Sequence, residues 1–235
     1  FILAGGLATR LGSLTRGKPK CLIDFWGHPF LYYQLGFLKK SGFKDVILCL
    51  GHLSDQVQRY VRETKPFNLN IRCSVEDHPL GTGGALRKAW IEEDFKEPIF
   101  VMNGDTLIDL DLAAFKRFHQ HHENEASMTL VKAFDDANCG VAKLDGEFVV
   151  SFKRKCTEPG KDLIDAGAYI LGLDVLKYMP SKPEFSLNEV LEVMALKRRL
   201  RAFRCYGTYI EIGTPARLKR ALKMKKYFIK LSSIN

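Results

Sequence analysis

The chain has 235 residues, of which 46% are hydrophobic and 27% are charged, and its formal net charge is +9. This composition predicts a globular protein with a full core, and no apolar run approaches the ~20 residues of a transmembrane helix. A net positive charge favours binding to small anionic substrates, nucleic acid or an anionic membrane surface. Because no stretch interleaves aromatic and basic residues as a nucleic-acid platform does, we expect no nucleic-acid partner.

Six cysteines are scattered without a C-x-x-C pair. Several stand inside apolar runs, which predicts buried free thiols in a cytoplasmic protein, and neither disulfides nor a zinc site. The chain starts in an apolar segment, with no secretory signal pattern and no initiator methionine, and we expect a few native residues upstream. Much of the positive charge lies after residue 196, where we interpret it as solvated helix faces.

The first segment holds a candidate phosphate-binding loop. Residues 1–4 are apolar and predict a buried strand, after which Gly5 and Gly6 begin a loop with hydroxyls and cations. Glycines let backbone amides approach an anion, while Arg10 offers a planar fork and Lys20 a compact charge. At the carboxyl end of a first strand this pattern favours a triphosphate site. An ordinary turn with solvated charges is the alternative.

The following residues alternate between helical and strand patterns. We expect helices over residues 29–40, 54–63 and 85–93, and strands over residues 46–50, 69–75 and 98–102. This alternation predicts βαβ units, and therefore an α/β fold with a parallel sheet.

Two polar stretches interrupt this pattern. Three glycines within residues 81–84 could form a backbone platform for a base edge, or simply a flexible turn. Asp105 follows Gly104 at the end of the strand at 98–102, where a carboxylate can hold a hard cation or cap a turn. We interpret Asp109 and Asp111 as a turn and a cap for a helix over residues 110–124.

Histidines 119, 121 and 122 lack metal-ligand spacing, and we expect them to be solvated. From residue 126 short strands predominate, at 129–133, 141–144 and 148–153, with Asp145-Gly146 as a hairpin turn. They predict an antiparallel insertion beside the parallel sheet. A helix over residues 189–200 and a bent strand or strand pair over 201–212 follow. Thr214 and Pro215 then predict a helix start.

The opening loop resembles a known family signature. Sugar-1-phosphate nucleotidyltransferases carry G-G-x-G-T-R-L followed by P-K, which stands here as residues 5–11 and Pro19-Lys20, with Ala8 as the one departure. Residues 79–85 read Pro-Leu-Gly-Thr-Gly-Gly-Ala and are similar to the base-reading segment of that family, in the form of the heptose 1-phosphate guanylyltransferase branch. Further similar stretches follow in the family's order along nearly the whole chain.

The resemblance implies a Rossmann-like three-layer αβα fold, similar to GT-A, with a mixed, mostly parallel central sheet and a small antiparallel insertion on the sugar side. It implies a single domain over residues 1–235, in which residues 1–125 bind the nucleotide and residues 126–235 the sugar phosphate. Whether the protein forms a homodimer stays open. The chain shows none of the repeats of a β-helix extension.

The resemblance also implies roles for particular residues. Arg10, Lys20 and Asp105 would be catalytic, with Arg10 on the departing pyrophosphate and Lys20 on the α-phosphate, while Asp105 and Glu211 would hold Mg²⁺. The implied nucleotide-binding residues are Leu3, Ala4, Gly5, Gly6, Thr9, Arg10, Glu76, Pro79, Gly81, Thr82 and Gly84. The implied sugar-phosphate-binding residues are Asn103, Gly140, Lys155, Asp165, Ala166 and Asn188.

Four residues depart from the family pattern on the sugar and metal sides. Glu211 replaces the aspartate of D-I-G-T-P, Asp165 the asparagine of N-A-G-x-Y, and Asn188 the glutamate of S-L-E, while Arg154 stands where an acid precedes the lysine. Three of the four lie where the sugar is expected to bind. They bear on the identity of the sugar more than on the reaction.

The implied reaction joins a nucleoside triphosphate, GTP in our first interpretation, to a sugar 1-phosphate, with D-glycero-α-D-manno-heptose 1-phosphate first among candidates, for surface-polysaccharide synthesis. Guanylylation of mannose 1-phosphate, uridylylation of N-acetylmuramate 1-phosphate and thymidylylation of glucose 1-phosphate stay open. So do a regulatory or scaffold subunit without catalysis and, from the D-x-D at residues 109–111, a metal-dependent glycosyltransferase.

Overall fold

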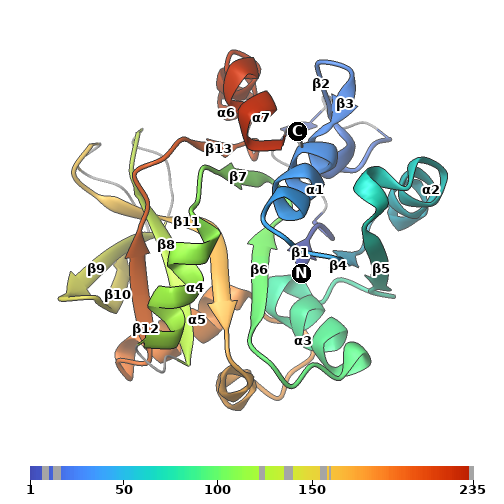
Figure 1. The fold of residues 1–235 in the computed structure, drawn as a ribbon. Helices are drawn as coiled ribbons and strands as arrows, with labels where there is room; N and C mark the ends of the chain where they lie inside the picture. Colours follow the sequence, from blue (N-terminus) through green and yellow to red (C-terminus); the bar gives the residue numbers. More distant parts are fainter. Residues whose placement is uncertain are drawn as a thin grey trace.

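The computed structural model describes residues 1–6, 11–12, 17–121, 125–134, 140–153, 158 and 160–232. Within them, nine strands form one sheet in the order β5-β4-β1-β6-β11-β8-β12-β10-β9 (Figure 1). The bounds of these strands in chain order are β1 Ile2–Leu3, β4 Asp45–Leu50, β5 Asn70–Val75, β6 Ile99–Asn103, β8 Ala126–Lys132, β9 Val141–Asp145, β10 Phe148–Lys153, β11 Leu163–Leu171 and β12 Leu200–Arg204.

The sheet is mixed, as the resemblance implied. Strands β5, β4, β1 and β6 are parallel neighbours, whereas β11 runs antiparallel to both β6 and β8. Strand β12 is parallel to β8 and antiparallel to β10, which forms a hairpin with β9. The antiparallel strands are therefore not a separate insertion beside the sheet but a continuation of it.

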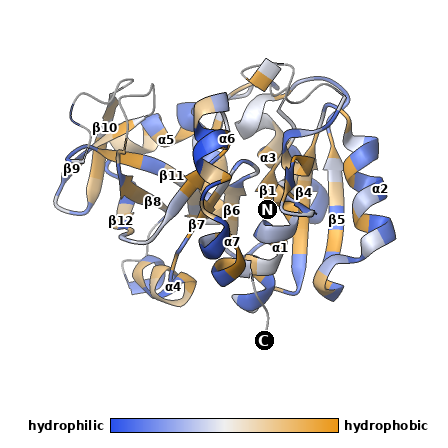
Figure 2. Cartoon of the chain, turned by 90° about the horizontal axis from the view of Figure 1, so that it is seen from above, coloured by the Kyte–Doolittle hydropathy of each residue, from blue (hydrophilic) through white to orange (hydrophobic). Residues whose placement is uncertain are grey.

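Helices cover both faces of the sheet and give the expected three layers. On one face lie α1 (Phe30–Lys40), α4 (Leu112–His121) and α7 (Lys225–Ser232), and on the other α3 (Gly81–Glu93) and α5 (Leu187–Leu196). Successive strand residues point to opposite faces, so Ile2 joins the core under α1 while Leu3 joins the core under α3. The neighbouring strands β1, β4 and β6 are mostly hydrophobic (Figure 2).

The remaining elements lie around this frame. They are the helix α2 (Ser54–Thr64) beside β5, the short helix α6 (Pro215–Ala221), and the 3₁₀ turns η2 (Lys20–Leu22), η3 (Pro66–Asn68) and η4 (Leu173–Tyr178). Two small two-stranded ribbons pair β2 (Asp24–Phe25) with β3 (His28–Pro29), and β7 (Thr106–Ile108) with β13 (Tyr209–Glu211). None of the described helices is long and apolar enough to cross a bilayer.

Most expected elements are present, with shifted ends. The predicted strand pair after residue 200 exists, but β12 and β13 belong to different sheets. The hairpin loop between β9 and β10 is Gly146-Glu147, because Asp145 still pairs with Phe148. Asp111 caps α4 as expected, since its Oδ1 accepts a hydrogen bond of 2.8 Å from the amide of Ala114.

The expectation that His119 is solvated is wrong. The side chain faces the core from α4, is only 5% exposed, and has its Nδ1 3.0 Å from Ser127 Oγ on β8. Burial lowers the pKa of this imidazole, because the charged form would lose its hydration. His121 is exposed, and His122 lies outside the described residues.

The prediction of buried free thiols is confirmed for three of the four cysteines that the structure describes. Cys21, Cys49 and Cys205 are buried free thiols and Cys73 is partly buried. Burial raises the pKa of the first three thiols to about 12, so they are inert at neutral pH.

Candidate active site

The ribbon of β7 and β13 brings two carboxylates together. Glu211, the last residue of β13, pairs with Thr106 at the start of β7, and the amide of Ile212 donates a 3.0 Å hydrogen bond to the carbonyl of Asp105. A Cβ added to Gly213 would collide with Glu211 Oε1 and would lie 3.4 Å from Asp105 Oδ2. The two acidic side chains therefore lie close together on either side of Gly213.

Lys20 is the partner of Asp105. Its Nζ lies 2.6 Å from Asp105 Oδ2, and the two side chains are 19% and 24% exposed. The amino group comes from η2, which follows the first loop, so the pair joins that loop to the end of β6. A charge-assisted hydrogen bond of this length holds both side chains in place.

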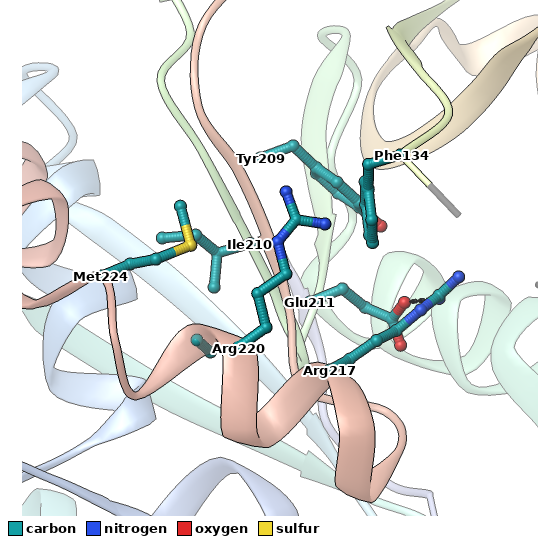
Figure 3. Close-up of a pocket in the computed structure, with 8 residues that line it drawn as sticks. Phe134, Tyr209, Ile210, Glu211, Arg217, Arg220 and Met224 are labelled. Atoms are coloured by element: carbon teal, nitrogen blue, oxygen red, sulfur yellow. Dashed lines mark ion pairs between the residues drawn. The ribbon is translucent and has the colours of Figure 1, made fainter. Parts of the chain in front are cut away.

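Arg217 is the partner of Glu211 and was not foreseen from the sequence. Glu211 Oε2 forms an ion pair with the Arg217 guanidinium (Figure 3), while Glu211 Oε1 accepts a 2.9 Å hydrogen bond from the amide of Gly213. Arg217 lies in the first turn of α6, whose predicted start is confirmed, since Thr214 Oγ1 caps the helix by accepting the Arg217 amide at 3.3 Å. The only sequence signal for the pair is the position of Arg217 three residues after that cap.

The loop that carries Asp105 is fixed by close packing and by Gln34. Gly104 donates its amide to the carbonyl of Leu3 at 2.8 Å, and a Cβ there would lie within 3.0 Å of Leu3 and Ala4 atoms. Gln34, fully buried on α1, donates from Nε2 to the carbonyls of Asn103 (2.9 Å) and Thr106 (2.8 Å). The sequence signal for this contact is the single amide among the apolar residues of α1.

The first glycine loop begins where expected, at the carboxyl end of β1. The predicted phosphate-binding residues Thr9 and Arg10, and the departure at Ala8, lie outside the described residues. Gly6 is exposed with open space around its Cα. A Cβ on Gly5 would lie 3.2 Å from Glu76 Oε1, and Glu76 Oε2 accepts the amide of Leu80 at 3.1 Å. Glu76 thus holds the chain before the second glycine segment and lies close to Gly5, and burial raises the pKa of its carboxyl group.

The second glycine segment packs closely on the chain before α5. The amides of Gly83 and Gly84 both donate to the carbonyl of Phe185, at 3.0 and 3.2 Å. A Cβ on Gly83 would collide with the Phe185 ring, and one on Gly84 with the carbonyl of Pro183. Gly84 thus has a packing role, and its predicted contact with the nucleotide stays a prediction. Pro79, Gly81 and Thr82 remain exposed at the start of α3.

On the predicted sugar side, β11 bulges between Asp165 and Tyr169. Gly167 adopts a φ of +72° there, a conformation that favours glycine, and a Cβ on it would lie 2.6 Å from Asn103 Nδ2. Asp165 Oδ1 accepts the amide of Gly167 at 2.8 Å, and Oδ2 accepts the hydroxyl of Tyr169 at 2.6 Å. The bulge therefore places Asp165 and Asn103 in one neighbourhood. Burial raises the pKa of Asp165 to about 6.

The other predicted sugar-phosphate residues are less tightly grouped. Gly140 accepts the amide of Asp165 through its carbonyl at 3.2 Å. Ala166 is fully buried in the core, so its side chain is not available to a ligand. Asn188 is exposed in the first turn of α5, next to Leu187, whose amide donates to Thr82 Oγ1 at 2.9 Å. Lys155 lies outside the described residues.

Asp105, just before β7, and Glu211, at the end of β13, offer the carboxylate oxygens that a hard cation prefers. Among the described residues, no group of three or more His, Cys, Asp or Glu side chains could enclose a metal. Two carboxylates suit Mg²⁺, which keeps several waters and takes substrate phosphates as further ligands. The residues present therefore fit a metal that binds together with a nucleotide, rather than one enclosed by protein alone.

The arrangement of a mixed sheet, a glycine loop after β1 and an acidic pair at the end of β6 agrees with the comparison to known families. Residues 1–217 match the family model described as nucleotidyl transferase. The chain belongs to the nucleotidyl transferase family. The matched range includes both glycine segments, Asp105 and Glu211.

Within the family, two kinds of curated relative are similar to the chain. A D-glycero-alpha-D-manno-heptose 1-phosphate guanylyltransferase of Campylobacter jejuni is 32% identical over 216 residues, which cover 92% of this chain and 94% of the relative. A mannose-1-phosphate guanyltransferase beta-B of Xenopus laevis is 34% identical over 220 residues, which cover 92% of this chain. The chain spans only 61% of the length of that frog relative.

A solved structure confirms the fold. The crystal structure of HddC from Yersinia pseudotuberculosis has 30% sequence identity and a TM-score of 0.80, and the match covers 94% of this chain and 96% of the other. A second structure of the Yersinia protein is a complex with GMP-PN and matches equally well.

Proposed function

We propose that the protein transfers a nucleotidyl group from a nucleoside triphosphate to a sugar 1-phosphate. In this reaction a phosphate oxygen of the sugar forms a bond to the α-phosphorus, the bond between the α-phosphorus and its bridging oxygen breaks, and pyrophosphate leaves. The observation that supports the proposal best is that the carboxylates of Asp105 and Glu211 lie close together beside Gly213. The amino group of Lys20 forms an ion pair with Asp105. These groups lie beside the end of β1, where the glycine loop begins.

The side chains suit phosphoryl chemistry more than acid–base chemistry. A phosphate is already an anionic nucleophile, so the site needs positioning and charge neutralisation. Lys20 would bind the α-phosphate, and Arg10 would bind the departing pyrophosphate. Asp105 and Glu211 would hold Mg²⁺, which when bound supplies positive charge against the phosphate oxygens.

We propose GTP as the nucleotide donor. Both similar curated relatives are named as guanylyl- or guanyltransferases, and the Yersinia structure holds GMP-PN. The exposed start of α3, with Pro79, Gly81 and Thr82, is the segment that would contact the base. Glu76 accepts the amide of Leu80 just before this segment and lies close to Gly5 of the first loop.

For the acceptor we propose D-glycero-α-D-manno-heptose 1-phosphate. The Campylobacter relative is covered over 94% of its length, whereas the mannose-1-phosphate relative from Xenopus is covered over 61%. Mannose 1-phosphate is the second candidate, because the identity to the Xenopus relative is 34%. Asp165 and Asn103, which the β11 bulge holds together, would contact the sugar in either case.

A panel of GTP, UTP, dTTP and CTP against heptose, mannose and glucose 1-phosphates, with pyrophosphate release as the readout, tests the proposal. We expect release with GTP and the highest kcat/KM with the heptose phosphate. A higher value with mannose 1-phosphate would favour the second candidate. Asp105→Asn is the control for contaminating activity. No release in any combination would contradict the proposed function and favour a scaffold role.

A further inference from the structure

The hydroxyl group of Tyr169 lies inside the protein on the predicted sugar side. The residue is only 1% exposed and belongs to the core under α3 and α5. Its hydroxyl donates to Asp165 Oδ2 at 2.6 Å. Burial and the Asp165 carboxylate raise the pKa of Tyr169 well above its usual value, whereas a hydrogen bond from the Asn103 side chain opposes this rise. Tyr169 therefore keeps its proton at neutral pH and lies between Asp165 and Asn103.

The Asn103 side chain lies where the reaction is proposed to occur. Asn103 is the last residue of β6 and pairs with the end of β1. A Cβ added to Gly167 would lie 2.6 Å from Asn103 Nδ2 and 3.0 Å from Thr106 Oγ1. Thr106 directly follows Asp105 and pairs with Glu211. The side-chain amide of Asn103 is therefore a neighbour of the segment that holds the two carboxylates together.

The hydrogen bonds from Asn103 through Tyr169 to Asp165 have one direction. Above its pKa of about 6 the Asp165 carboxylate only accepts, and it is a stronger acceptor than an amide oxygen, so the single proton of Tyr169 goes to Asp165. The Tyr169 oxygen then accepts from Asn103, which has to present Nδ2 to it. Within the described residues, Gln34 and Thr106 donate to the backbone carbonyl of Asn103 and not to its side chain. Its Oδ1 is therefore left for a ligand.

We propose that Tyr169 is a positioning residue for the acceptor, and that it orients the Asn103 amide so that Oδ1 accepts a hydroxyl group of the sugar 1-phosphate. The inference rests on the proposed function, since it takes Asn103 to be a sugar contact. It also gives a reason for Asp165, which stands where the family pattern has an asparagine. An asparagine could either accept from Tyr169 or donate to it, and would leave the orientation of Asn103 open.

The first test is Tyr169→Phe, which removes the hydroxyl group and keeps the ring. Pyrophosphate release is measured with GTP and D-glycero-α-D-manno-heptose 1-phosphate, or with mannose 1-phosphate if the substrate panel favours it. The pH is slightly alkaline, so that Asp165 is ionised. We expect KM for the sugar phosphate to rise about three- to tenfold, the usual net contribution of one hydrogen bond. KM for GTP should stay unchanged.

Tyr178→Phe is the matched control. The Tyr178 hydroxyl also donates to a carboxylate oxygen at 2.6 Å, on Glu125. That residue precedes β8, whereas Asp165 pairs with Leu130 toward the other end of this strand. Tyr178→Phe therefore removes the same kind of hydrogen bond away from the site, and both KM values should equal those of the natural protein. Circular dichroism checks that each variant folds.

A second measurement tests the orientation of Asn103 itself. Fluorine in place of a hydroxyl group cannot donate a hydrogen bond, so the natural protein should discriminate, in kcat/KM, against the monodeoxyfluoro sugar phosphate that lacks the hydroxyl bound to Oδ1. Asn103→Ala identifies this analogue, because the discrimination against it disappears in that variant. The same discrimination should shrink in Tyr169→Phe and stay intact in Tyr178→Phe. If Tyr169→Phe does not fold, Asp165→Asn decides, since it should also weaken the discrimination against this analogue.

An unchanged KM for the sugar phosphate and an unchanged discrimination in folded Tyr169→Phe would overturn the positioning role. Equal rises of KM for GTP and for the sugar phosphate would overturn it too, because they indicate a general loss of structure. So would a natural protein in which no discrimination depends on Asn103. Absence of pyrophosphate release from the natural protein in every combination would instead contradict the proposed function, so the two failures are distinguishable.

Discussion

Lys20 Nζ lies 2.6 Å from Asp105 Oδ2, which joins the end of the first loop to the end of β6 at the point where the triphosphate is proposed to bind. The two residues come from segments far apart in the sequence, and each side chain is partly exposed. The pair is a pre-formed charge arrangement, in which the lysine can exchange a carboxylate oxygen for a phosphate oxygen without moving far.

Replacing Lys20 by methionine should lower turnover by about 10²–10³-fold, the usual scale for the loss of one preorganised charge partner. The methionine keeps most of the side-chain volume, so stability should change little by comparison. Pyrophosphate release under saturating substrates measures the effect. Lys96→Met, at the exposed pair with Asp94, is the matched control and should be unaffected. Near-normal turnover in the Lys20 variant would remove Lys20 from the catalytic machinery.

Replacing Gln34 by methionine should both destabilise the protein and lower turnover. The side-chain amide is the hydrogen-bond donor to the carbonyls of Asn103 and Thr106 on either side of Asp105, and a buried carbonyl that loses its donor costs about 1–3 kcal/mol. Urea unfolding measures the stability, and steady-state kinetics separate kcat from KM. A positioning role predicts a fall in kcat at unchanged KM for the sugar phosphate.

The matched control for that variant is Gln56→Met, because Gln56 makes a single exposed hydrogen bond, to the carbonyl of Gly17 at 2.8 Å. It should change neither stability nor kcat appreciably. Loss of stability in Gln34→Met with kcat intact would mean that Gln34 supports the core but does not position Asp105.

Gly83→Ala should destabilise the protein by about 1–3 kcal/mol, the usual range for overpacking. The added methyl group would overlap the Phe185 ring, which is itself buried and cannot move aside easily. Gly140→Ala is a suitable comparison, because the nearest atom to its added Cβ, on Phe152, is 3.7 Å away. Thermal unfolding followed by circular dichroism gives both values, and equal melting temperatures would contradict the packing role of this segment.

The parts of the fold that depend on residues adjacent in the sequence were predictable. Apolar runs located the strands of the sheet, and Thr214 followed by Pro215 located the start of α6, because a cap and its helix are neighbours in the chain. The resemblance identified Asp105 and Glu211 before the structure placed them together across Gly213. That proximity depends on the pairing of β7 with β13, which no local pattern specifies.

What the sequence did not reveal depends on partners from distant segments. Arg217 looked like one more solvated cation until Glu211 was found beside it. His119 looked solvated because its neighbours are polar, whereas Ser127 on β8 satisfies its ring in the core. The glycines of residues 81–84 suggested a ligand platform, and the chain at residues 183–187 packs closely against all three of them. In each case a side chain on another element decided the outcome.

The stability of the protein should depend on the ionisation of Asp165. Burial raises the pKa of this carboxyl group from 3.8 to about 6, so between these values the folded protein holds a proton that the unfolded chain releases. The resulting stabilisation is fully present below about pH 4 and is lost as the pH rises through about 6, by up to about 1.4 kcal/mol for each pH unit crossed. Asp165→Asn removes this contribution, because the amide does not titrate.

Urea unfolding of the natural protein and of Asp165→Asn at about pH 4.5 and pH 7 measures the difference between the two free energies of unfolding. We expect the natural protein to lose stability relative to the variant as the pH rises. The amide also cannot accept the Gly167 hydrogen bond through its nitrogen, but that loss adds a constant offset. Asp145→Asn, at an exposed ion pair with Arg198, should not show this trend. A difference independent of pH would show that Asp165 is ionised in the folded protein throughout this range, with its charge stabilised by the Tyr169 hydroxyl and the Gly167 amide.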